Sequence, residues 1–243
     1  MLKDILIFIM MSIISYFTVT LIHELGHVIA GLCNGLKFFM LVIGPLGLMR
    51  DENDKIKLYI EKNTLFWGGI AGTTPIENSN ISINTISSIL IAGPIVQLLS
   101  GLIFIFVFLY SSKIFFLLLG AMAVGVSIMC LIPLPRIGGV LTDGTRWLKI
   151  RKNKEYGLVE TAFFNIAQSY YKYRNCSQIN FSDVSNLINN EDPCNQYMGH
   201  YFLMHYYKDN GDIENMEEEI KYLENLEEKL PVSFIKIYNY KDA

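Results

Sequence analysis

The sequence predicts an α-helical membrane protein with a small β-hairpin and a separate helical domain after it. Two observations support this class. The chain of 243 residues is 51% hydrophobic and only 18% charged, whereas soluble domains contain about 25% charged residues. The charge is also uneven, because 27 of the 43 Asp, Glu, Lys and Arg residues follow Gly144. We therefore expect an apolar domain over residues 1–150 and a polar domain over residues 151–243.

The composition also excludes several classes of protein. The high hydrophobic share excludes a disordered chain, and a net charge of -3 gives no reason to expect nucleic acid as a partner. The four cysteines form no Cys-x-x-Cys pair and have no disulfide-framework spacing. A reduced, intracellular polar domain is the simpler interpretation.

Three apolar runs are each long enough to cross a bilayer, which takes about 20 residues. We expect helices over about residues 5–33, 87–110 and 114–134. The first is interpreted as a retained span and not a signal peptide, because it has a weakly basic start and no small-residue cleavage site. The short polar segment 110–113 makes the second and third spans an antiparallel hairpin.

The basic residues in the connecting segments predict the orientation of the spans. Lys and Arg are frequent between the first and second spans and after the third, whereas the opposite side carries only Lys3 and Lys113. Because basic loops stay in the cytoplasm, we expect a multi-pass protein of the cell membrane with its N-terminus outside and its C-terminus in the cytoplasm. The abundant Ile, Asn and Lys fit a bacterial origin.

The segment between the first two spans predicts a membrane-associated β-hairpin over about residues 37–62. Residues 38–49 are apolar, 50–55 carry a turn signal, and 56–60 alternate between apolar and polar side chains. A glycine-containing run at 67–75 follows, with the interfacial aromatic Trp67. A surface hairpin with its loop explains this pattern as well as a substrate-facing role does.

The polar domain predicts helices over residues 155–174, 196–208 and 213–229. The last two resemble a helical-repeat hairpin, although one hairpin is weak evidence for a repeat array. The aromatic stripes of these helices are typical of a packed core. Two roles stay open for the domain: docking a cytoplasmic partner, or capping the membrane domain.

Residues 23–27 read His-Glu-Leu-Gly-His and lie in the first span. His23 and His27 are spaced i and i+4, so they share a helix face and can bind one metal ion. Glu24 lies about 100° around the helix from His23, where it reaches a water molecule at the metal without being a ligand. A plain polar helix end is the alternative, but a charge inside a membrane costs about 2.5–3.5 kcal/mol unless it is paired or bound.

A catalytic zinc site needs a third protein ligand. Asp143, in an Asp-Gly pair after the third span, is expected on the same side of the membrane as His23 and His27. A simple Asp-Gly turn is the alternative, and it would be favoured if the segment stood alone. His200 and His205 are spaced i and i+5, which is poor for sharing a face. We therefore expect one Zn²⁺ ion held by His23, His27 and Asp143.

A membrane-embedded His-Glu-x-x-His sequence with a downstream Asp-Gly pair resembles the site-2 protease family of intramembrane zinc metalloproteases, peptidase family M50. The similarity covers about residues 5–150. It implies that His23, His27 and Asp143 are the zinc ligands and that Glu24 is the catalytic glutamate. In addition, Ala92-Gly93-Pro94 is similar to a family Gly-Pro motif, and Pro133-Leu134-Pro135 to the proline-rich segment before Asp-Gly.

The sequence departs from the family pattern at three places. Gln97 and Cys130 stand where many members have asparagine, and residues 136–142 lengthen the segment before Asp143. These departures leave the expected zinc site intact. The identity of the substrate stays open because of them.

The resemblance implies a three-span metalloprotease core that hydrolyses a peptide bond in or near a transmembrane segment. The implied partners are the lipid bilayer, a membrane protein or hydrophobic peptide substrate (a regulatory protein, signal-peptide remnant or peptide precursor) and a cytoplasmic partner at the helical domain. The candidate substrate-binding residues are Phe38, Phe39, Gly68, Gly69, Gly93, Pro94 and Gln97. Two alternatives stay open: a non-proteolytic zinc-binding scaffold or peptide export or immunity factor, and a pseudoprotease. The intact Glu24 favours the enzyme, because binding alone does not need it.

Overall fold

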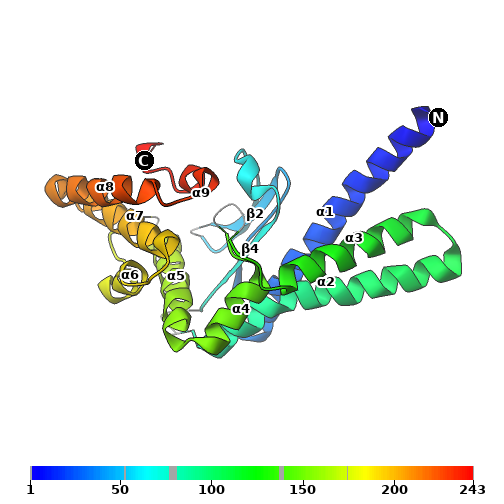
Figure 1. Ribbon diagram of the computed structural model, residues 1–243, viewed down its shortest axis with the longest axis horizontal. Helices are drawn as coiled ribbons and strands as arrows, with labels where there is room; N and C mark the ends of the chain where they lie inside the picture. The colour runs from blue at the N-terminus through cyan, green and yellow to red at the C-terminus, as the bar shows by residue number, and fades with distance from the viewer. Residues whose placement is uncertain (1, 52, 77–80, 137–139, 174, 243) are drawn as a thin grey trace. The chain divides into compact units, whose positions relative to one another are not determined.

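The computed structural model describes residues 2–51, 53–76, 81–136, 140–173 and 175–242 (Figure 1). The chain forms two compact units, which we describe separately. The first unit consists of Met1–Asn80, Ser87–Pro133 and Thr142–Trp147. The second consists of Ile81–Ile86, Leu134–Leu141 and Leu148–Ala243.

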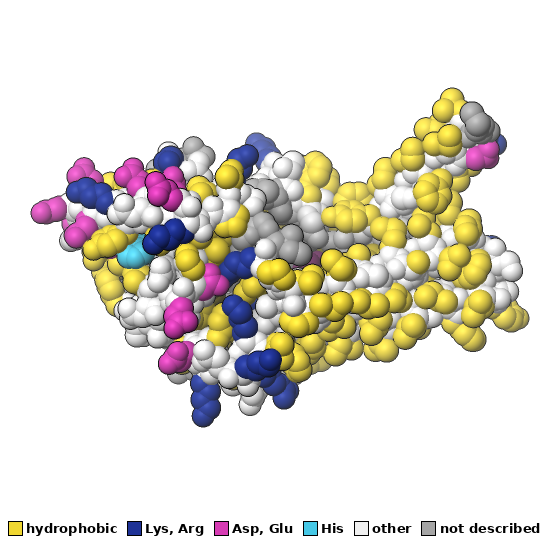
Figure 2. Space-filling view, viewed as in Figure 1, with side chains coloured by type: hydrophobic (Ala, Val, Ile, Leu, Met, Phe, Trp, Pro, Cys, Tyr) yellow, Lys and Arg dark blue, Asp and Glu magenta, His cyan; other side chains and the backbone are white. Residues whose placement is uncertain are grey.

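Three long apolar helices dominate the first unit: α1 (Leu2–Cys33), α2 (Ile83–Ser111) and α3 (Ile114–Leu131). All three are long and apolar enough to cross a membrane, which confirms the three predicted spans. Their outward side chains are apolar, as the yellow surface in the right half of Figure 2 shows, and Phe106 and Leu109 are 70% and 71% exposed. Such side chains suit a hydrocarbon surrounding and not water.

The spans pack through buried apolar side chains and through glycines that allow close approach. Val19 of α1 is buried against Leu119 and Ala123 of α3. A Cβ atom added at Gly120 of α3 would lie 2.9 Å from the carbonyl oxygen of Gly101 in α2, so glycine permits the close approach of these backbones, as is common between membrane helices. The predicted hairpin turn is present between α2 and α3, where Ser112 has a φ of 57°.

A four-stranded antiparallel sheet follows α1, with the order β3-β2-β1-β4. The strands are β1 (Lys37–Ile43), β2 (Leu46–Arg50), β3 (Ile56–Ile60) and β4 (Ile70–Thr74). The hairpin predicted around the turn at 50–55 is present as β2 and β3. The apolar segment 38–49, however, forms two strands, because the chain turns at Gly44 and Pro45 and β1 pairs with β2. The sequence indicated a flexible run where β4 lies, because glycine and alanine have low strand propensity. This strand forms by pairing with β1, with Leu41 opposite Ala71 and Val42 opposite Ile70.

The second unit is helical after α4 (Asp143–Lys152), a helix that the two units share. Its helices are α5 (Lys154–Tyr173), α6 (Phe181–Ile188), α7 (Pro193–Asp209), α8 (Ile213–Glu227) and α9 (Val232–Ile237). Helices α5, α7 and α8 match the three predicted ones within a few residues; the short helices α6 and α9 were not predicted. Side chains of Asn180, Asp192 and Asp212 cap α6, α7 and α8.

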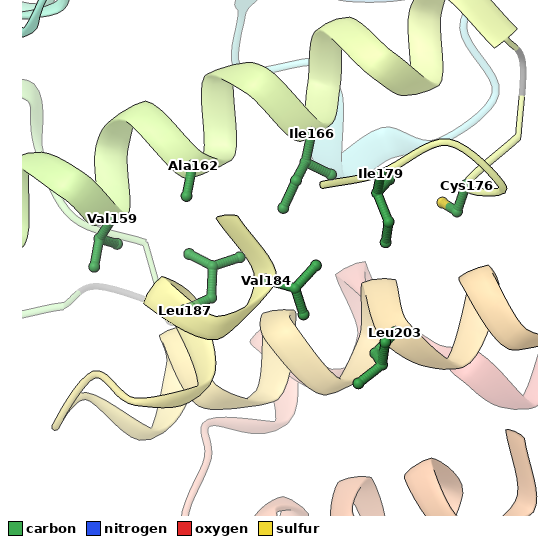
Figure 3. Close-up of a cluster of buried hydrophobic side chains, with 8 residues drawn as sticks. All are labelled: Val159, Ala162, Ile166, Cys176, Ile179, Val184, Leu187 and Leu203. Carbon is green, nitrogen blue, oxygen red and sulfur yellow. The ribbon is translucent and has the colours of Figure 1, made fainter. Parts of the chain in front are cut away.

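Two buried clusters hold this unit together. In the first, Val159, Ala162 and Ile166 of α5 face α6 and α7, as Figure 3 shows. In the second, Tyr197 of α7 is fully buried and packs edge-on against Phe234 of α9. Aromatic side chains such as Tyr197 and Phe234 are therefore core residues, as predicted, whereas Tyr170 of α5 and Tyr222 of α8 are exposed.

Candidate metal centre

Helix α1 places two histidines on one face, one turn apart. The Nε2 atoms of His23 and His27 lie 3.1 Å from each other. His23 is 9% exposed, and the His27 side chain is 13% exposed. The i, i+4 spacing thus has the predicted result of two imidazoles that point at one location.

Asp143 completes this cluster from a distant part of the chain. It is the first residue of α4, and its Oδ2 atom lies 3.1 Å from His23 Nε2 and 3.5 Å from His27 Nε2. In the described part of the chain, these three residues are the only group of His, Cys, Asp and Glu side chains whose ligand atoms cluster in this way, all within 4.8 Å of one another. The structure therefore brings together the three residues that the sequence suggested as ligands.

The spacing of these atoms fits a zinc ion. Zinc bonds to nitrogen and oxygen are about 2.0–2.2 Å long, which puts neighbouring ligand atoms of a tetrahedral site about 3.3–3.4 Å apart. The three distances in the cluster, 3.1, 3.1 and 3.5 Å, bracket this value. The fourth tetrahedral position has no protein ligand among the described residues, which is typical of catalytic sites.

Two further groups orient the imidazoles through the Nδ1 atoms, which lie on the ring edge away from the cluster. His27 Nδ1 lies 2.7 Å from the backbone oxygen of Ile89, and His23 Nδ1 lies 2.8 Å from Gln97 Oε1. A carbonyl oxygen only accepts hydrogen bonds, so the Nδ1 atom of His27 carries the proton and its Nε2 atom presents a lone pair to the cluster. Metal-binding histidines in proteins are held in this way.

The charge state of Asp143 also suits a ligand. Burial alone would raise the pKa of its carboxyl group. When the imidazoles of His23 and His27 also carry protons on Nε2, their hydrogen bonds and positive charges outweigh that effect and hold the pKa well below its usual range. The group is therefore an ionised carboxylate, as a metal ligand must be.

Glu24 is buried beside the cluster and is 8% exposed. Its carboxylate oxygens are not part of the group of clustered ligand atoms. The loop before β4 lies against it, because a Cβ atom added at Gly69 would meet Glu24 Oε1 and Thr20 Cγ2. The candidate residue Gly69 thus contacts the carboxyl group that the sequence suggests as the catalytic base.

The Gly-Pro motif lies against the histidines. A Cβ atom at Gly93 would collide with the imidazole ring of His27, and one at Gly26 would lie 2.8 Å from Gly93 Cα. Pro94 is fully buried, and its carbonyl oxygen accepts a hydrogen bond of 2.7 Å from Ser127 Oγ. The motif therefore lets α2 approach α1 beside His27.

The remaining candidate residues are placed as follows. Gln97 is fully buried behind His23, whereas Phe38 and Phe39 lie half-buried in β1, and Gly68 is exposed in the loop before β4. Sequence reasoning missed the hydrogen bonds of the Ile89 backbone oxygen and of Gln97 to the histidines. A backbone oxygen has no sequence signal, and Gln97 was singled out only as a departure from a family asparagine and as a candidate substrate-binding residue.

Comparison with known proteins agrees with this geometry. The family model of peptidase family M50 matches residues 11–224, which is most of the chain. Neither a curated protein nor a solved structure matches. The matched segment contains the His-His-Asp cluster, the apolar helices α2 and α3, and the part of α1 that follows residue 10. It belongs to peptidase family M50, the site-2 protease family of membrane metallopeptidases.

Proposed function

We propose that this protein is an intramembrane zinc endopeptidase that cuts a peptide bond in or near a transmembrane segment of a membrane-tethered substrate. One observation carries the proposal: the cluster of His23, His27 and Asp143, with zinc-like spacing, lies next to Glu24 on a helix that is apolar enough to span a membrane. The substrate class includes regulatory membrane proteins, signal-peptide remnants and hydrophobic peptide precursors.

The zinc ion would be held by His23 Nε2, His27 Nε2 and Asp143 Oδ2. When bound, zinc polarises the scissile carbonyl group and lowers the pKa of water to about 7. Glu24 takes a proton from the attacking water and passes it to the leaving amine. Its burial beside the ligands keeps this carboxylate close to the reacting atoms and away from bulk water.

A transmembrane substrate presents a second problem, because the carbonyl groups of a helix are already hydrogen-bonded and hidden. It must unwind locally before cleavage. We propose that the unwound segment adds as a strand to the β1–β4 sheet. Strand β4 is an edge strand of this sheet and begins next to Gly69, which contacts Glu24. A peptide added to β4 therefore passes the catalytic glutamate in extended form.

We also propose the orientation that the loop charges predict, with the N-terminus outside and the helical unit in the cytoplasm. The segment that follows Asp143 supports it, since α4 carries Arg146, Lys149, Arg151 and Lys152 and has no acidic residue after Asp143. Such basic segments stay on the cytoplasmic side. In this position the helical unit is available to dock a cytoplasmic partner.

The test is the substitution Glu24→Gln, with zinc content and cleavage measured together. Zinc content of the purified protein is expected to stay near one ion per chain while cleavage is lost, because the amide cannot take the proton. Cleavage is followed by comparing the membrane proteomes of cells that express the wild type and the variant. Surviving cleavage contradicts the role of Glu24, and a wild-type protein without zinc contradicts the metal centre.

A further inference from the structure

We infer that Gln97 is a positioning residue of the metal centre, whose amide oxygen holds His23 in the one ring tautomer that can bind a metal through Nε2. The inference rests on the proposed function, because it assigns a role toward the zinc ion. It concerns a residue that contacts one ligand from behind and does not touch the metal itself.

The geometry places His23 between two groups. Its Nε2 atom faces Asp143 Oδ2 and His27 Nε2, both at 3.1 Å, whereas its Nδ1 atom faces Gln97 Oε1 at 2.8 Å. The Gln97 side chain comes from α2, a different helix from His23, and is fully buried. One side chain therefore sets the orientation of the ring at the edge opposite the metal cluster.

The chemistry of the imidazole explains why this contact matters. A neutral histidine carries one N–H, and the nitrogen that binds a metal must be the other one. With Gln97 Oε1 facing Nδ1, the proton resides on Nδ1 and Nε2 keeps its lone pair. The reversed amide would donate to Nδ1 and leave the proton on Nε2, where it blocks metal binding. Only one orientation of the Gln97 amide is therefore compatible with a metal.

The two histidines differ in how they are held. The partner of His27 Nδ1 is the backbone oxygen of Ile89, which can only accept a hydrogen bond. The partner of His23 is a side chain that offers both an acceptor and donors. A substitution can therefore remove the support of His23 and leave that of His27 in place.

The second half of the Gln97 amide points to the same role. Its Nε2 atom is buried and has no hydrogen-bond partner among the residues that the structure describes. A buried donor without a partner lowers stability, so Gln97 is a poor choice for folding alone. The contact of its amide oxygen with His23 gives the side chain a role other than folding. An apolar replacement of similar length is accordingly expected to weaken metal binding without lowering thermal stability.

The experiment uses the full-length protein in detergent and three variants. Gln97→Met keeps the length of the side chain but removes the amide, and Gln97→Glu keeps an oxygen acceptor for His23. Ser127→Ala is the control, because it removes a buried hydrogen bond between α3 and α2, to the carbonyl oxygen of Pro94, and leaves the ligands untouched. The readouts are zinc affinity by chelator competition, the visible spectrum with Co²⁺ alone, and the melting temperature.

Gln97→Met is expected to weaken zinc binding about 10–100-fold, the usual effect of losing a group that orients a ligand, and to change the Co²⁺ spectrum. Gln97→Glu is expected to bind zinc close to the wild type. Ser127→Ala is expected to lower the melting temperature and leave zinc affinity unchanged.

Three results overturn the inference. The first is a Gln97→Met protein with the zinc affinity and Co²⁺ spectrum of the wild type. The others are a zinc affinity in Gln97→Glu or in Ser127→Ala that is as low as in Gln97→Met. If Gln97→Met does not fold, Gln97→Leu replaces it, because it also removes the amide oxygen that faces His23 and is expected to weaken binding too. A wild-type protein that binds no zinc contradicts the proposed function itself. This result is distinguishable from a failure of the Gln97 inference, because it is seen without any variant.

Discussion

The backbone of Gly69 lies directly against the carboxyl group of Glu24. A Cβ atom added at Gly69 would lie 2.6 Å from Glu24 Oε1, and the φ angle of Gly69 is 109°, which L side chains rarely adopt. These two residues come from α1 and from the loop before β4. The loop therefore determines the space that is available to the proposed catalytic base.

Gly69→Ala is expected to lower the rate of cleavage about 100-fold. The new methyl group would displace the Glu24 carboxyl group, and a displacement of about 1 Å lowers the rate by about that factor. Zinc content is expected to stay at the wild-type level, since Gly69 does not contact the ligands. The control is Gly125→Ala in α3, whose added Cβ atom would meet nothing within 4 Å. Equal activity of the two variants in a cleavage assay contradicts the relationship.

Gly93→Ala is expected to weaken zinc binding, because the new methyl group would collide with the His27 imidazole. An effect of about 10–100-fold is typical when a metal-binding histidine loses its orientation. Zinc affinity by chelator competition measures it. Gly125→Ala in α3 is the matched control, since its Cβ atom would meet nothing within 4 Å. A Gly93→Ala protein with unchanged affinity shows that α2 does not limit the position of His27.

His23→Ala is expected to abolish stoichiometric zinc binding, whereas His200→Ala is not. His200 Nδ1 lies 2.7 Å from Glu219 Oε2, and its ring stacks on Tyr222. Its loss is therefore expected to lower the melting temperature of the second unit, where it joins α7 to α8. Metal analysis of the two purified variants, together with thermal unfolding, separates these effects. Loss of zinc in His200→Ala contradicts the assignment of the ligands.

Cys33 is expected to report the orientation of the spans. It is exposed at the end of α1, while Cys176 and Cys194 are buried, and burial raises the pKa of the Cys176 thiol to about 12. Because the thiolate is the reactive form, Cys176 and Cys194 are expected to stay unlabelled in the folded protein. A membrane-impermeant maleimide is expected to label Cys33 only after the cells are permeabilised.

The matched control for this experiment is Lys113→Cys, at the exposed turn between α2 and α3. It is expected to react in intact cells, because this turn lies on the opposite side of the membrane from Cys33 in the proposed orientation. The reverse labelling pattern contradicts that orientation and leaves the metal centre untouched.

The parts of the site that the sequence predicts are those that depend on one helix or on the order of the spans. His23 and His27 share a face because any α-helix brings positions i and i+4 together. Asp143 was predicted from its place after the third span and from the resemblance to M50 proteins. The contacts of Ile89 and Gln97 depend on how α2 is rotated about its axis, and no spacing in the sequence reports that rotation.

The fold, too, has parts that the sequence predicts and parts that it does not. The spans follow from the length of their apolar runs, and the paired strands β2 and β3 from the turn signal at 50–55. Strand β4 could not be predicted, because its residues form a strand only through their partners in β1. The lengthened segment before Asp143 includes residues 137–139, which lie outside the described residues.

The metal centre joins residues that are 120 positions apart, since His23 pairs with Asp143. During synthesis at about 5–20 residues per second, the nascent chain carries both histidines and Glu24 for roughly 6–24 s before Asp143 is made. A two-histidine site lacks the third ligand of catalytic zinc sites. The order of these residues in the chain therefore means that the complete set of three proposed ligands exists only after all three spans have been translated.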